Sequence, residues 1–121
     1  MTQPQIYQHT VKKMELSERE IREEIVKRIQ KAAHPRKIVL FGSRARGDAE
    51  PDSDYDLLVV KDEIKSRRDE SHQIRMALMA LPIFVDVLLR RTDEDNGKQQ
   101  LHIGIQKSLA EEGIILYERG A

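Results

Sequence analysis

The chain has 121 residues and a mass of 14.0 kDa, which is the size of a single domain. Its 21 basic and 21 acidic residues balance to a formal net charge of +0, which disfavours a general binder of nucleic acids or acidic membranes. Cysteine is absent, so disulfides, thiolate zinc sites and a cysteine nucleophile are excluded. No apolar run approaches the roughly 20 residues of a membrane span, and the first residues lack the layout of a signal peptide. We therefore expect a cytoplasmic protein without a membrane partner.

The N-terminal part is expected to consist of an arm followed by a helix. Residues 1–16 carry only scattered apolar side chains, and we assign one domain to residues 17–119. Ser17 and Glu20 have the spacing of a capping box, which marks the start of a helix. Isoleucines then recur at helical spacing until His34-Pro35, where the helix is expected to end.

The rest of the chain alternates between short apolar runs and stretches of helical periodicity. The expected strands are residues 37–41, 54–60, 83–89 and 114–117. Between them lie a loop or helical turn (44–53), a charged stretch (61–73), a helix ending at Pro82, a polar linker or helix start (92–100), and a helix ending near Gly113. This order predicts one α/β layer domain, with the third strand covered on both faces as in the centre of a sheet.

The first candidate for chemistry is Gly42-Ser43, directly after the first strand. Glycine permits a sharp turn and a close approach of phosphate to the backbone. Ser43 offers a hydroxyl and its own N–H to a phosphate oxygen, and a helical turn starting there would add a positive dipole end. A bare Gly-Ser more often marks an ordinary strand-ending turn.

The second candidate is the pair Asp54-x-Asp56 at the start of the second strand. Because strand side chains alternate, both carboxylates should share one face, about 6.6 Å apart along the chain. Two like charges held so close repel each other unless a cation lies between them, and such oxygen ligands suit Mg²⁺ bound together with substrate phosphates. Asp93-x-Asp95 has the same spacing, but it lies in the polar linker, where carboxylates are expected to be solvated.

The third candidate is Asp86, a lone carboxylate within the apolar run of the third strand. A buried carboxylate without a partner costs several kcal/mol, so it must be paired, protonated or bound to metal. An arginine partner is the simpler alternative. Combined with the other two features, however, Asp86 completes the requirements of two-metal nucleotidyl transfer, in which two ions about 3.5–4 Å apart activate a hydroxyl and neutralise a triphosphate.

These residues resemble the signature of the minimal nucleotidyltransferases, within the polymerase-β-like superfamily. The resemblance rests on Gly42-Ser43, ten intervening residues, Asp54-Tyr55-Asp56, and Asp86 at the place of the family's third acid, and it spans about residues 17–118. It implies a mixed four-stranded sheet flanked by helices, and transfer of AMP from ATP to a hydroxyl. It also implies that Gly42 and Ser43 hold the β- and γ-phosphates, and that Asp54, Asp56 and Asp86 bind two Mg²⁺ ions. Arg44 and Arg46 are then phosphate contacts or surface charges.

The resemblance also implies a partner. Small bacterial members of this kind are commonly antitoxins of HEPN-domain ribonuclease toxins, which they are thought to adenylylate on a tyrosine within a hetero-oligomer. Two alternatives remain open. One is a small-molecule nucleotidyltransferase of the aminoglycoside-modifying kind, although no acceptor domain is visible. The other is an antitoxin that only binds its toxin and uses the acids to hold nucleotide.

Overall fold

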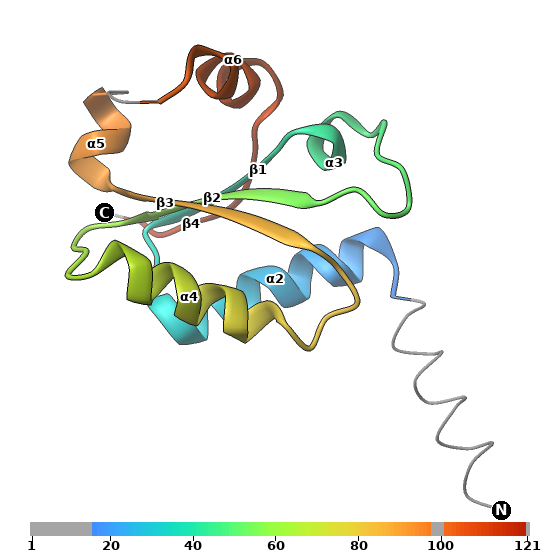
Figure 1. Ribbon diagram of the computed structural model, residues 1–121, viewed down its shortest axis with the longest axis horizontal. Coiled ribbons are helices and arrows are strands. Elements are labelled where there is room, and N and C mark those ends of the chain that lie inside the picture. Colours follow the sequence, from blue (N-terminus) through green and yellow to red (C-terminus); the bar gives the residue numbers. More distant parts are fainter. Residues whose placement is uncertain (1–15, 98–100, 121) are drawn as a thin grey trace, which may run out of the picture.

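The structure is a computed structural model that describes residues 16–97 and 101–120 (Figure 1). Except for Leu16, the expected N-terminal arm lies outside these residues. Within them, no helix is long and apolar enough to cross a membrane. The elements in chain order are α2 (Glu18–Ala33), β1 (Lys37–Phe41), α3 (Ser43–Arg46), β2 (Tyr55–Lys61), α4 (Arg67–Leu78), β3 (Val85–Arg91), α5 (Thr92–Gly97), α6 (Ile103–Glu112) and β4 (Ile114–Glu118).

The four strands form one mixed sheet in the order β3-β2-β1-β4. Strand β1 is antiparallel to both β2 and β4, whereas β2 and β3 run parallel. The expectation of a mixed four-stranded sheet flanked by helices is therefore confirmed. The expectation of a central, doubly covered third strand is wrong, because β3 lies at the edge of the sheet.

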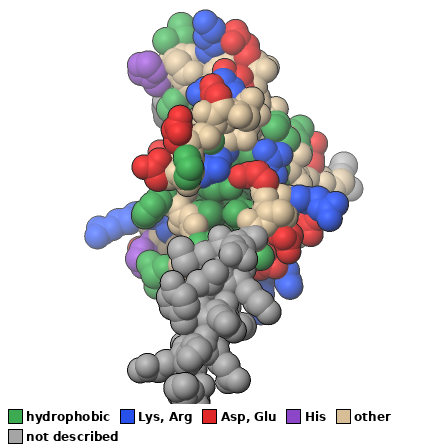
Figure 2. Space-filling view, turned by 90° about the vertical axis from the view of Figure 1, so that its right-hand side faces the viewer, with side chains coloured by type: hydrophobic (Ala, Val, Ile, Leu, Met, Phe, Trp, Pro, Cys, Tyr) green, Lys and Arg blue, Asp and Glu red, His purple; other side chains and the backbone are tan. Residues whose placement is uncertain are grey.

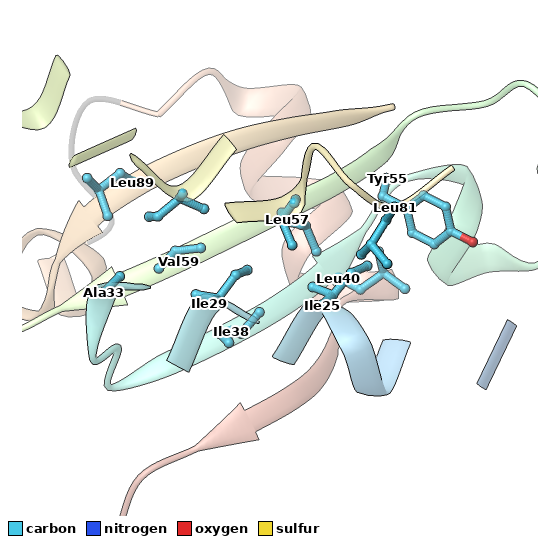
Figure 3. Close-up of a cluster of buried hydrophobic side chains, with 12 residues drawn as sticks. Ile25, Ile29, Ala33, Ile38, Leu40, Tyr55, Leu57, Val59, Leu81 and Leu89 are labelled. Atoms are coloured by element: carbon cyan, nitrogen blue, oxygen red, sulfur yellow. The ribbon is translucent and has the colours of Figure 1, made fainter. Parts of the chain in front are cut away.

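Helices α2 and α4 cover one face of the sheet and enclose the main hydrophobic core (Figures 1 and 3). Alternate strand residues point into this layer, as the two-residue period of a strand requires. Tyr55, the largest of the fully buried side chains, lies among them with its ring near the α2 side. The buried core residues are Ile25, Ile29, Ala33, Ile38, Leu40, Tyr55, Leu57, Val59, Ile74, Leu78, Leu81 and Leu89.

The opposite face of the sheet is only partly covered. Val39, Leu58 and Val60 form a smaller buried cluster there, against which Leu109 of α6 packs. Helix α3 lies at one end of this face, α5 lies at the other, and α6 lies between them (Figure 1). The end occupied by α3 is the end at which β1 finishes and β2 and β3 begin.

Local sequence explains where the helices begin and end. At α2, Ser17 and Glu20 form the expected capping box, and His34 ends the helix in a left-handed conformation with φ 49°. Helix α4 begins within residues 61–73, for which the sequence indicates only a charged stretch. There the Ser66 side chain accepts a hydrogen bond from the Asp69 N–H and caps a first turn that faces solvent.

The polar linker after the third strand begins with a short helix, α5. The expectation that Asp95 is a solvated linker carboxylate is wrong. Its Oδ2 accepts from the Lys37 Nζ at 3.0 Å, and only 19% of the Asp95 side chain is exposed. This ion pair joins α5 to the beginning of β1.

Candidate functional site

The three candidate acids meet at the end of the sheet that carries α3. In the parallel register, Asp56 of β2 is directly paired with Asp86 of β3. Paired residues of neighbouring strands point to the same face, and Asp54 reaches that face too because it lies two residues before Asp56. The strand pairing thus adds Asp86 to the face that the sequence pattern predicts for Asp54 and Asp56.

The surroundings of Asp86 differ from those expected. The sequence predicted a buried carboxylate, but Asp86 is exposed because β3 is an edge strand with this face uncovered at that point. Asp54 is exposed as well, whereas Asp56 is partly buried between its neighbours. Because Asp86 is exposed, burial does not force this carboxylate to find a partner.

The turn after β1 brings backbone against Asp56. Gly42 has φ +76°, a conformation that other residues rarely adopt. A Cβ atom added at Gly42 would lie 2.1 Å from Oδ2 of Asp56, since Phe41 and Asp56 are paired across β1 and β2. Glycine is thus required here for two reasons, its backbone angle and the close approach of the carboxylate. Ser43 follows immediately as the first residue of α3.

The electrostatics of the cluster are those of crowded like charges. The pKa of Asp56 is raised, first by burial and then by the negative charges of Asp86 and Asp54, with Arg46 acting weakly in the opposite direction. None of the three carboxylates takes part in a salt bridge within residues 16–97 and 101–120. The negative charge of the cluster is therefore left without a matching cation from the described part of the chain.

This donor set fits a magnesium ion. Carboxylate oxygens are hard ligands, and a divalent cation among them would offset the charges of Asp86 and Asp54, which add to the effect of burial in raising the pKa of Asp56. No three acidic or histidine side chains of the described residues converge closely enough to form a complete cage by themselves. Mg²⁺ usually binds through one or two carboxylates, with water and substrate phosphates supplying the remaining ligands, so it does not require such a cage.

Arg44 holds the loop that leads to Asp54. Its guanidinium donates to the backbone oxygens of Pro51 and Ser53 and to Oε1 of Glu18, at distances of 3.1–3.3 Å. The same group lies 4.5 Å from the centre of the Tyr55 ring. In this arrangement Arg44 fixes the path of the chain into β2, and so the place of Asp54.

Glu18 and Tyr55 complete this support, and the sequence analysis missed both. The Tyr55 hydroxyl donates to Oε1 of Glu18 at 2.5 Å, and burial together with this bond raises the pKa of Tyr55. One signal was available. A tyrosine between two aspartates at the start of a strand must point into the core, where its hydroxyl needs a partner. The sequence did not indicate that Glu18, 37 residues earlier, supplies that partner.

Arg46 is directed toward α6. It bonds Asp48 at 3.1 Å and Glu112 at 2.9 Å, and these carboxylates raise its pKa. Figure 2 looks onto this end of the molecule, where acidic and basic side chains are interspersed. The structure thus brings Gly42, Ser43 and the three acids together, while both arginines make bonds within the chain.

A cavity of about 790 Å³ opens on the same side of the sheet, between α6 and the beginning of β1. Val39, Leu58, Leu109 and Ile115 contribute to its mainly apolar lining. None of the three acids lines it. The acid cluster is therefore a separate site on the open surface at the opposite end of the strands.

The match to a known family accounts for this combination of sheet, turn and acids. Residues 23–121 match the family described as Polymerase beta, Nucleotidyltransferase. The chain belongs to this nucleotidyltransferase family. No curated protein sequence matches the chain.

Solved structures of the same fold include members of toxin–antitoxin pairs. A candidate nucleotidyltransferase from Sulfolobus solfataricus superposes with a TM-score of 0.56 at 22% identity, over 82% of this chain and 78% of that one. A toxin–antitoxin structure with AMP-PNP gives 0.57 at 19% identity, over 81% and 73%. A complex of the tri-AMPylated Shewanella oneidensis HEPN toxin with MNT antitoxin gives 0.51 at 17% identity, over 85% and 74%. At these identities the likeness concerns the fold.

Proposed function

We propose that the protein is a Mg²⁺-dependent adenylyltransferase that moves AMP from ATP to a tyrosine hydroxyl of a HEPN ribonuclease toxin, and so acts as its antitoxin. The observation that carries the chemistry is the register of β2 and β3, which pairs Asp56 with Asp86 two residues beyond Asp54. Membership of the nucleotidyltransferase family supports the class of reaction.

In this proposal Asp54 and Asp56 hold two Mg²⁺ ions, and Asp86 shares the ion on the acceptor side. The ions would lower the pKa of the attacking hydroxyl and neutralise the triphosphate. The acceptor oxygen then forms a bond to the α-phosphorus while the bond to the β-phosphate breaks, so that pyrophosphate leaves and the hydroxyl proton passes to solvent. Asp86 suits the acceptor side because it lies on the exposed edge strand.

Gly42 and Ser43 are proposed to receive the β- and γ-phosphates. The absence of a side chain at Gly42 lets the backbone lie directly against Asp56, which places the turn beside a phosphate that would share a metal ion with this carboxylate. The Ser43 hydroxyl would donate to a phosphate oxygen. Arg44 is proposed to act mainly by holding the Pro51–Ser53 loop, and Arg46 could contact phosphate by leaving Asp48 and Glu112.

The proposal of a protein acceptor rests on the open surroundings of the acids. The edge at Asp86 is exposed, and the three acids lie outside the 790 Å³ cavity, so we propose that an acceptor protein supplies the other half of the site. The structural likeness to complexes of HEPN toxin and MNT antitoxin, one with an AMPylated toxin, supports a toxin as that acceptor.

The test is mass spectrometry of the toxin encoded by the adjacent reading frame after incubation with this protein, ATP and Mg²⁺. We expect increments of about 329 Da, the mass of an added AMP, on a toxin tyrosine, together with loss of ribonuclease activity. The double variant Asp54→Asn/Asp56→Asn serves as the control. Neutralisation of an unmodified toxin by both proteins would favour an antitoxin that only binds, and AMP on an added aminoglycoside instead would favour a small-molecule transferase.

A further inference from the structure

One half of the free edge of β3 is closed and the other half is open. The Tyr55 N–H donates to the Phe84 oxygen at 2.8 Å, which sets the hydrogen-bonding pattern between β2 and β3. In a parallel pair this directs the backbone groups of Phe84, Asp86 and Leu88 toward β2, and those of the odd-numbered residues outward. An outward-facing edge can pair with another chain unless it is blocked.

The C-terminal half of this edge is blocked by side chains. The guanidinium of Arg67 donates to the Leu89 oxygen, and the Arg91 N–H donates to Oε1 of Glu94 at 2.8 Å. Arg67 and Glu94 also bond each other at 2.9 Å, so the two blocking side chains form one unit. Beyond Arg91 the chain turns directly into α5.

The N-terminal half has no such cover. Within the described residues, the outward N–H and C=O groups of Val85 and Val87 have no hydrogen-bond partner from a side chain or another strand. The open stretch is the part of the edge that flanks Asp86, the acid assigned to the acceptor side. As far as the described residues extend, the edge of β3 is therefore free beside the acid cluster and blocked toward its C-terminal end.

Phe84 stands next to this open stretch on the same face as the acids. It lies two residues before Asp86 and, by the register of Tyr55 with Val85, level with Asp54. Its side chain is 68% exposed, although an aromatic ring of this size is normally well buried. An exposed aromatic ring beside three carboxylates is a surface on which another aromatic side chain can stack.

We propose that Phe84 and the open edge at Val85–Val87 dock an extended segment of the acceptor protein, which carries its tyrosine onto the Phe84 ring. This inference rests on the proposed function. Neighbouring strands lie about 4.8 Å apart, and aromatic pairs prefer ring centres about 4.5–7 Å apart, so a tyrosine on an added strand is within reach of Phe84. Because Asp86 is the next residue on the same face of β3, a tyrosine held against Phe84 would present its hydroxyl beside the acid cluster. Backbone hydrogen bonds with Val85 and Val87 would fix the register, as in other cases of strand addition.

Steady-state AMP transfer to the toxin tests the aromatic contact. We expect Phe84→Ala to raise the KM for toxin roughly tenfold, in line with the loss of an aromatic pair and its buried area, while the KM for ATP stays within twofold of wild type. Phe84→Tyr should restore the KM for toxin. Met79→Ala is the matched control, because Met79 is also 68% exposed but lies outside the acid cluster, and it should behave as wild type.

Hydrogen exchange of the complex tests the edge without altering it. The transfer-deficient Asp54→Asn variant is mixed with the toxin, and the Val85 and Val87 amides should become protected while the Arg91 amide, already bonded to Glu94, does not change. Unchanged exchange at both valines together with an unchanged KM for Phe84→Ala would overturn the docking surface while leaving the proposed function intact.

Two further outcomes separate the inference from the proposed function. If the toxin protects Val85 and Val87 but wild-type protein never transfers AMP to it, the adenylyltransferase is wrong and the docking surface stands. If these amides are protected without toxin and the protection grows with protein concentration, the edge pairs with a second copy of this chain, and toxin docking is overturned.

Discussion

Strand β2 carries an aspartate near each end, and the two have opposite environments. Asp62, just beyond the end of the strand, accepts hydrogen bonds from Arg36 and Thr92 and also contacts Arg119; these partners, Arg36 above all, lower its pKa to about 2. Asp56, near the start, has a raised pKa because of burial and the charges of Asp86 and Asp54. At one end of the sheet, arginine side chains balance the charge of the aspartate. At the other end, the aspartate lies beside two further carboxylates.

The difference separates structural from functional charge. Asp62 forms salt bridges with Arg36, just before β1, and with Arg119, just after β4, so it links these two segments. Asp56 is repelled by the charges of Asp86 and Asp54, and none of the described residues forms a salt bridge with it. Such an arrangement is typical of a site that becomes favourable only when a cation binds.

The largest expected effect is the loss of transfer when the charge of the cluster is reduced. Under the proposed function, Asp54→Asn or Asp56→Asn removes a direct metal ligand. Mutation of residues that only hydrogen-bond to metal ligands typically costs about 10- to 100-fold in activity, so AMP transfer should fall by more than that. Asp62→Asn is the control at the other end of β2 and should leave transfer near wild type. Equal losses for Asp56→Asn and Asp62→Asn, measured by AMP incorporation, would remove the distinction between the two ends.

A smaller loss is expected for Ser43→Ala. The hydroxyl positions a phosphate through a charge-assisted hydrogen bond of about 1.5–3 kcal/mol, so transfer should fall roughly ten- to a hundredfold without disappearing. The rate of AMP incorporation at saturating toxin measures this. A loss as complete as that of Asp56→Asn would mean that Ser43 has a role beyond holding phosphate.

The melting temperatures of Asp56→Asn and Asp62→Asn should change in opposite directions. Without Mg²⁺ at pH 7, Asp56→Asn should raise the melting temperature because it removes repulsion, whereas Asp62→Asn should lower it because Arg36 and Arg119 lose their shared partner. Thermal unfolding in EDTA measures both. Adding Mg²⁺ and AMP-PNP should stabilise wild type and leave Asp56→Asn nearly unchanged. A lower melting temperature for Asp56→Asn in EDTA would contradict the repulsion.

The contributions of Asp56 and Glu70 to the free energy of unfolding should depend on pH in opposite ways. The raised pKa of Asp56 adds stability below the pKa of the unfolded chain, about 3.9, and this contribution is lost as pH rises through the higher folded pKa. Glu70 behaves oppositely. Lys61 and the N–H groups of Ser66 and Lys65 lower its pKa to about 2, so its contribution is complete above pH 4.5 and lost toward pH 2. The stability advantage of Asp56→Asn, followed by urea unfolding, should therefore shrink on acidification.

Local patterns in the sequence predicted much of this molecule, and tertiary contacts explain the rest. The capping box at Ser17 and the alternation around Asp54 and Asp56 act within a few residues, so the sequence displays them directly. The start of α4 was hidden because its first turn faces solvent and carries charges. The apolar run around Asp86 suggested a central strand, but strand order depends on pairing between distant segments, and β3 became an edge. The bond between Arg44 and Glu18, which supports the loop before Asp54, likewise joins segments 26 residues apart.

The most direct test of the account is the binding of ATP, measured by calorimetry with Mg²⁺ and again with EDTA. If the three carboxylates bind a cation together with ATP, wild-type protein should bind ATP much more tightly with Mg²⁺. In EDTA, the negative charges of Asp54, Asp56 and Asp86 repel the triphosphate. The double variant Asp54→Asn/Asp56→Asn should lose most of this dependence on Mg²⁺. Equal affinity of wild-type protein for ATP in Mg²⁺ and in EDTA would contradict the central claim.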